Sequence, residues 1–272
     1  MAKKFKLFNS YEKEGRGVSK TEKLSKKGFI IFFELYFQNF GKLLTAGFLN
    51  LLFCIPVLTN GLADVGLTNI TRNIYCGRHS FGASDFFETI KKNWKQALPL
   101  GILKIVTGVI IFIATYYYVI GEGNLSAIGL GVCIFAIFVF LSMLNYIPLL
   151  TISFGLKIKK IISNSFKFVF LNVWRNILII LIDAFFVAVG LLVILYGDSH
   201  AVTLSIYIVL MLCFYPAFRT LSVQFLVFPS VRKYMIDPYY EEHPDADIEL
   251  RRSMGLLPPE DGENVFNDEL CN

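Results

Sequence analysis

The sequence predicts an all-α protein that crosses a membrane several times as a helical bundle. Hydrophobic residues make up 55% of the chain and charged residues only 17%, a composition outside the usual range of soluble domains. Several apolar runs also reach the roughly 20 residues that a helix needs to cross the hydrocarbon core of a bilayer. The Lys and Arg residues, in contrast, are concentrated outside these runs.

Four long apolar runs are the clearest candidates for membrane-spanning helices. Each is apolar on all sides, as expected for a helix that contacts lipid or the core of a bundle. The runs cover residues 97–120, 125–153, 177–196 and 202–228. Residues 121–124 and 197–200 are expected to be short turns between these runs.

An aromatic segment, GFIIFFELYFQNF, precedes a shorter apolar run at residues 43–58. The segment is too short to cross a bilayer, and its Lys-rich flank suits lipid headgroups while Phe29, Ile30, Phe33 and Phe37 suit acyl chains. We therefore expect an N-terminal amphipathic helix that lies in the membrane interface. The alternative is that this segment extends the first span.

The distribution of basic residues predicts that both chain termini are cytoplasmic. Residues 1–27 and the loops at 78–96 and 157–175 are rich in Lys and Arg, as cytoplasmic segments are. Two crossings before residue 78 would keep all three on one side of the membrane. The chain should therefore return through residues 62–76, which gives about six membrane helices. In the alternative with five spans, the return segment lies on the membrane surface.

Pro56, Thr59, Asn60 and Gly61 predict a tight turn before the return segment. Pro56 should end the preceding helix, Thr59 and Asn60 can cap the next one, and Gly61 eases the turn. The return helix would be about 22 Å long at roughly 1.5 Å per residue, which is short for a full span.

The return segment carries polar side chains at helical spacing. Asp64, Thr68, Thr71, Arg72 and Tyr75 should share one face of the helix. This face should be hidden from lipid against neighbouring helices, because polar groups in hydrocarbon are costly.

Arg72, Lys104, Asp183 and Arg219 are the candidate functional residues, because charged side chains within a membrane are commonly functional. One interpretation is a polar cavity or relay that binds a solute or an ion. The interpretation that we favour is an interhelical lock, in which Asp183 pairs with Arg72 or Arg219. Lys104 would then extend along its stem to the lipid headgroups.

Enzyme motifs are missing from the sequence. It contains no P-loop, no G-x-S-x-G elbow and no H-E-x-x-H helix, its three His residues are far apart, and its five Cys residues form no C-x-x-C pair. We therefore expect a non-enzymatic protein without a metal or other cofactor. Nucleic acid is not an expected partner, because the net charge of +5 arises from basic loops combined with an acidic C-terminal segment.

The expected organisation has three parts. A basic cytoplasmic segment covers residues 1–27, the transmembrane helical domain covers 28–228, and an acidic cytoplasmic tail covers 229–272. The tail mixes acidic and apolar residues with prolines, so it could dock on another cytoplasmic surface or remain solvated.

A cytoplasmic amphipathic helix is expected before the first long run. Asp85 can cap it, and Phe86, Phe87, Ile90 and Trp94 would form an apolar stripe. This stripe could lie on the membrane or form a contact with a partner protein.

Two motifs, PVLTNG (Pro56–Gly61) and DFFETIKKNWKQA (Asp85–Ala97), are similar to those of the YesL-like family of bacterial membrane proteins, a domain of unknown function. The resemblance continues more loosely to Met235. It implies a Gram-positive plasma membrane and frequent association with genes for carbohydrate ABC importers and glycoside hydrolases, and it implies no catalytic residues. Asp64 departs from the small or apolar residues that family members tend to have after the glycine.

These observations predict a non-enzymatic accessory or assembly subunit of a carbohydrate ABC importer. Its partners would be the lipid bilayer and the permease subunits of that importer. The alternative is a stand-alone solute transporter or channel, in which Arg72, Asp183 and Arg219 line the path.

Overall fold

The structure is a computed structural model that describes residues 28–78, 82–196 and 200–242 of the 272-residue chain. Within these residues it contains helices and no strand. The expected basic segment 1–27 and most of the expected acidic tail lie outside the described residues. The elements are α1 (Gly28–Gln38), α2 (Phe40–Cys54), η1 (Val57–Thr59), α3 (Asn60–Tyr75), α4 (Ala83–Ile120), α5 (Asn124–Ser153), α6 (Ile158–Leu171), α7 (Val173–Tyr196), α8 (His200–Cys213), α9 (Tyr215–Val231), the π-helical η2 (Arg232–Ile236) and α10 (Asp237–Glu242).

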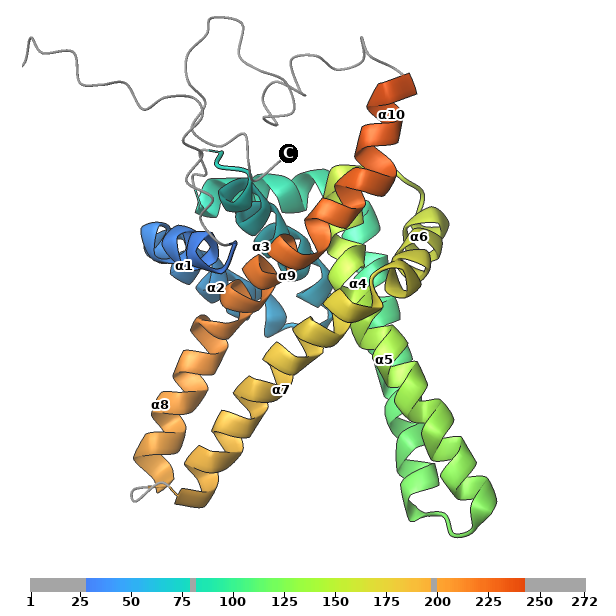
Figure 1. Cartoon of the computed structure of the whole chain (residues 1–272). Helices are drawn as coiled ribbons and strands as arrows, with labels where there is room; N and C mark the ends of the chain where they lie inside the picture. Colours follow the sequence, from blue (N-terminus) through green and yellow to red (C-terminus); the bar gives the residue numbers. More distant parts are fainter. Residues whose placement is uncertain (1–27, 79–81, 197–199, 243–272) are drawn as a thin grey trace, which may run out of the picture.

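Two helical hairpins extend from a compact group of helices, which we call the head (Figure 1). The head consists of α1, α2, α3, α6 and α9 together with the adjoining ends of α4, α5 and α7. One hairpin is α4 with α5, and the other is α7 with α8. They leave the head on the same side and diverge, so that their tips lie far apart (Figure 1). The short turn expected between the first two long runs is present between Ile120 and Asn124.

Three helices of the described chain are long and apolar enough to cross a membrane: α4, α5 and α7. The helices α8 and α9 provide a fourth if this bent pair is one span. The protein is thus a helical membrane protein, and the expected number of about six membrane helices stays a prediction. The other two expected membrane helices are α2 and α3, which have 15 and 16 residues and are short for a full span.

The helix α3 is the centre of the head. It contacts α2, α4, α5 and α9, and 12 of its 16 residues are buried. Four members of its predicted polar face, Thr68, Thr71, Arg72 and Tyr75, are among them, whereas Asp64 is partly exposed. The return segment therefore lies inside the protein and not on its surface.

The turn before α3 differs from the prediction in two details. Pro56 follows the end of α2 in an extended conformation, as expected. Thr59, however, donates hydrogen bonds back to the carbonyl groups of Phe53 and Pro56 and does not cap α3 with its side chain. Gly61 lies within α3 and not in the turn. A Cβ atom on Gly61 would lie 2.2 Å from the carbonyl oxygen of Ala97, so this glycine permits a close helix crossing.

The amphipathic helix expected before the first long run and that run itself form one continuous helix, α4, of 38 residues. The sequence predicted two elements here. Pro99 lies inside α4 without ending it. Its nitrogen cannot donate to the carbonyl of Lys95, but both residues are on the exposed side of the helix, where solvent or headgroups can satisfy that carbonyl.

The run expected as a single span at 202–228 is broken at Phe214, where α8 and α9 meet at 44°. Pro216 in the first turn of α9 has no N–H to donate to α8, which favours a break. Gly47 of α2 packs against this bend, since a Cβ atom on Gly47 would lie 2.1 Å from the carbonyl oxygen of Cys213.

The aromatic segment forms the separate helix α1, so it is not an extension of α2. Phe29 and Phe37 are exposed, whereas Phe32 and Tyr36 pack edge-on against Phe218 of α9. One face of α1 is thus attached to the head. Its position in the membrane interface stays a prediction.

Candidate functional site

The first polar pair of the site results from the close crossing of α3 and α4. Gly61 and Gly101 face each other there, and a Cβ atom on Gly61 would lie 2.7 Å from the Cα atom of Gly101. Lys104 is three residues beyond Gly101, and its Nζ atom lies 2.6 Å from Oδ2 of Asp64. The same Nζ atom donates a hydrogen bond of 2.6 Å to Oδ1 of Asn60.

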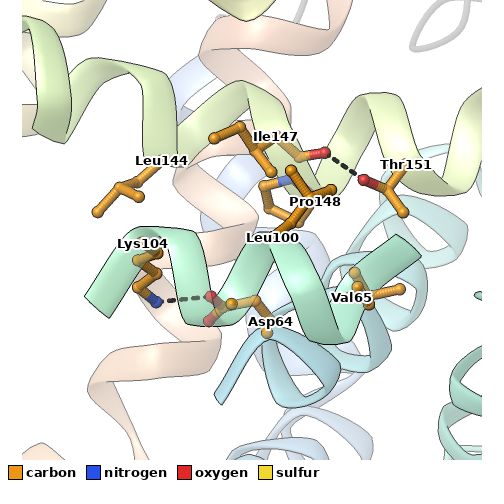
Figure 2. A pocket seen from close by; sticks show the side chains of 11 residues that line it. Asp64, Val65, Leu100, Lys104, Leu144, Ile147, Pro148 and Thr151 are labelled. Carbon is orange, nitrogen blue, oxygen red and sulfur yellow. Dashed lines mark hydrogen bonds and ion pairs between the residues drawn. The ribbon is translucent and has the colours of Figure 1, made fainter. Parts of the chain in front are cut away.

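The partner of Lys104 corrects the sequence prediction. We expected this side chain to extend to the lipid headgroups, but its ammonium group binds Asp64 and Asn60 of α3, and about a quarter of the side chain remains exposed. Figure 2 shows Lys104 and Asp64 pointing toward each other across the α3–α4 contact. The pair joins helices whose polar residues are 40 positions apart in the sequence.

The second polar pair connects α7 with α9. Nε of Arg219 donates to both carboxylate oxygens of Asp183, at 3.1 and 3.2 Å. The hydroxyl of Tyr215 donates to Oδ1 of Asp183 at 2.6 Å, and Nη2 of Arg219 donates to Oδ1 of Asn145 of α5 at 2.9 Å. The structure therefore contains the interhelical pair between Asp183 and Arg219 that the sequence offered as one of two pairings.

Arg72 lies elsewhere in the head. Its Nη1 atom donates to Oγ of Ser153 at 3.2 Å, and its guanidinium group lies 5.7 Å from the ring centroid of Phe228. Its side chain is buried. Arg72 thus links α3 to α5 and α9, and the alternative pairing with Asp183 is not formed.

A polar cavity of about 180 Å³ lies between the two pairs. The helices α3, α4, α5 and α9 contribute to its walls. Both members of the first pair, Asp64 and Lys104, line it, and so does Arg219 of the second pair. The full lining is Asp64, Thr68, Lys104, Leu144, Asn145, Pro148, Arg219, Thr220 and Val223. A second pocket of about 20 Å³ shares Asp64, Lys104, Leu144 and Pro148 with it (Figure 2).

An apolar groove of about 590 Å³ lies on the other side of the second pair. Residues of α2, α7, α8 and α9 line it, and Asp183 is among them. Arg219 lines the polar cavity while its partner Asp183 lines the groove. The Asp183–Arg219 pair is therefore part of the wall between the two.

The predicted partner stripe is only partly accessible. Phe86 is fully buried, with its ring against Gly66 of α3, and Ile90 is also buried. These two residues fill the contact between α3 and α4, so the expectation that they touch a partner is wrong. Phe87 and Trp94 are 42% and 50% exposed and remain available.

Two residues of the site were not predicted to belong to it: Asn60, which was expected only as a helix cap, and Tyr215. Each precedes a charged residue of the site by four positions, Asn60 before Asp64 and Tyr215 before Arg219. That spacing places both side chains of each pair on one helix face, so it could have identified them. Within the described residues, no group of three or more His, Cys, Asp or Glu side chains could hold a metal ion.

The family model described as "Protein of unknown function, DUF624" matches residues 43–115 of the chain. This range contains α3 and most of α2 and α4, including the α3–α4 crossing. It also contains both motifs that resemble the YesL-like family, with which the match is consistent. The comparisons with curated proteins and with solved structures found no match.

Proposed function

We propose that this protein is a non-enzymatic accessory or assembly subunit that packs against the membrane helices of another protein. The partner that we propose is the permease of a carbohydrate ABC importer, in a bacterial plasma membrane and with both termini of this chain in the cytoplasm. The identity of the partner rests on the family resemblance. The general role rests on the two diverging hairpins.

The hairpins supply the observation that carries this proposal. Large apolar side chains are exposed along both of them, for example Ile113 at 60% and Phe135 at 57% in α4 and α5, and Val187 at 63% and Val209 at 60% in α7 and α8. Helices in a bilayer associate through close van der Waals packing. Two hairpins that diverge from a packed head provide separate surfaces on which helices of another protein can pack.

The polar interior is better suited to a scaffold than to a sugar pathway. Both pairs join different helices, and Asp183 receives three hydrogen bonds from Tyr215 and Arg219. The cavity of about 180 Å³ is below the roughly 300–1,000 Å³ of most small-molecule pockets. These features support a protein that holds its hairpins in place, in preference to a stand-alone transporter.

Purification from the native host at native expression level, in mild detergent, tests the proposal. Mass spectrometry of the retained proteins should identify permease subunits of a carbohydrate importer in a constant ratio to this chain. Reproducible recovery of the intact chain alone would contradict the proposal. Solute flux into liposomes that contain only this protein would then support the transporter alternative.

A further inference from the structure

We propose that the polar cavity between α3, α4, α5 and α9 is a binding site for a small oxyanion, of the carboxylate or phosphate class. Lys104 and Arg219 would bind it together with Asn145. This inference is independent of the proposed accessory role, because it concerns the isolated chain.

The walls of the cavity offer unused hydrogen-bond donors. The ammonium group of Lys104 has three N–H donors, of which two are directed to Asn60 and Asp64. Arg219 uses Nε for Asp183 and Nη2 for Asn145, and its Nη1 atom has no hydrogen bond within the described part of the chain. One ammonium N–H and the Nη1 group therefore remain for a ligand.

Asn145 provides the most specific indication of a ligand. Its side chain is 3% exposed and lines the cavity. Its Oδ1 atom accepts from Arg219, which fixes the orientation of the amide, and its Nδ2 atom has no partner among the described residues. A buried amide donor without an acceptor is costly, and an oxygen atom of a ligand in the cavity would satisfy it.

The remaining polar groups of the cavity are compatible with an acceptor ligand. The hydroxyl groups of Thr68 and Thr220 donate to carbonyl groups of their own helices, those of Asp64 and Pro216. The cavity lining contains two cations, Lys104 and Arg219, against one carboxylate, Asp64. Asp183 lines the apolar groove on the other side of Arg219, but its carboxylate binds Nε of Arg219 and neutralises that cation. The preference for an acceptor ligand therefore rests on the unused N–H donors and not on an excess of positive charge.

The volume of the cavity suits a small anionic group. A volume of about 180 Å³ corresponds to roughly six water molecules at about 30 Å³ each. This is sufficient for acetate or inorganic phosphate. The phosphate of a lipid headgroup has the same chemistry, and it is the second possible source of the oxyanion.

Titration calorimetry on the purified full chain in phosphatidylcholine nanodiscs tests the free-anion source. Acetate and inorganic phosphate are the probes, at constant ionic strength set with chloride. We expect saturable binding of at least one of them. Native mass spectrometry after delipidation tests the other source, since a retained phospholipid would assign the site to a headgroup.

Asn145→Asp is the diagnostic variant. It retains an acceptor for Arg219 but replaces the free donor by a carboxylate, so it should weaken binding of the anion or retention of the lipid at least ten-fold. Asn73→Asp adds the same charge outside the cavity lining and should bind as the wild type does. Leu144→Phe fills the cavity without a change in charge, and it should also weaken binding if Asn145→Asp does not fold. Absence of both anion binding and lipid retention in the wild type, or equal binding in all folded variants, would overturn the proposal.

Discussion

Gly61 and Gly101 determine the geometry of the first polar pair, because neither has a side chain to keep α3 and α4 apart. Their backbone contact brings Lys104 within reach of Asn60 and Asp64. At the second pair, Asp183 and Arg219 are joined by hydrogen bonds to Tyr215 and Asn145. The close backbone contact of the two glycines therefore determines where Lys104 and Asp64 can meet.

Gly61→Ala tests the crossing. The new Cβ atom would lie 2.2 Å from the carbonyl oxygen of Ala97, so the helices must separate, and we expect the free energy of unfolding to fall by about 1–3 kcal/mol. Thermal unfolding in detergent measures this change. Gly131→Ala in α5 is the matched control, since a Cβ atom there meets nothing within 4 Å. Equal stability of the two variants would show that the α3–α4 crossing can accommodate a Cβ atom at position 61.

A double-mutant cycle tests the second pair. Asp183→Asn leaves the guanidinium group of Arg219 without its carboxylate, and we expect a loss of about 1–3 kcal/mol in the free energy of unfolding. Combined with Arg219→Gln, the coupling energy should be about 0.5–2 kcal/mol. The pair of Arg232 and Asp237, at 3.2 Å, joins residues only five positions apart, and its carboxylate is 43% exposed, so it should give about 0–1 kcal/mol. Coupling no larger than in that control would contradict the role of the pair as a lock.

The sequence identified the charged residues but only one of the two pairs. Asp183 and Arg219 could be matched because few opposite charges occur in the long apolar runs. The partner of Lys104 could not be found, because Asp64 meets it only through the glycine crossing. Gly61 was assigned to a turn for the same reason. A glycine that permits close packing and one that permits a turn look alike without knowledge of the opposing helix.

The central helix α3 is in contact with α2, α4, α5 and α9. It contacts the first hairpin directly through α4 and α5, and α9 lies between it and the second hairpin, since α9 contacts α7 and α8. Its predicted helix and its buried polar face could be obtained from spacing alone. The joining of the amphipathic helix to the first long run in α4, and the break between α8 and α9, could not. Both depend on whether a proline nitrogen lies where its missing hydrogen bond is tolerated.

The two aromatic residues at the start of α4 should behave differently on mutation. Phe86→Ala removes a fully buried ring and should lower the free energy of unfolding by about 3–5 kcal/mol. Trp94→Ala removes a half-exposed side chain and should change it by no more than about 0.5 kcal/mol. Thermal unfolding compares them. If Trp94 contacts the partner, Trp94→Ala should also reduce co-purification, and unchanged recovery would exclude that contact.

At the scale of the whole molecule, the head places two hairpins at an angle in one membrane. From Lys104 to the end of α4 at Ile120 the helix rises about 24 Å, and from Asp183 to Tyr196 about 20 Å, at roughly 1.5 Å per residue. Both distances are shorter than the hydrocarbon thickness of about 30 Å. With the hairpin tips at one surface, the two polar pairs lie toward the other, where the head begins.

Site-specific photo-crosslinking in cells of the native host tests the central claim most directly. A photoreactive phenylalanine analogue at Phe135 of α5 and at Phe185 of α7, both well exposed, should form crosslinks from both hairpins to permease subunits of one importer. The same analogue at Phe168, which is buried, should form crosslinks only within the chain. Crosslinks from both exposed positions to lipid alone would contradict the account of this protein as an accessory subunit.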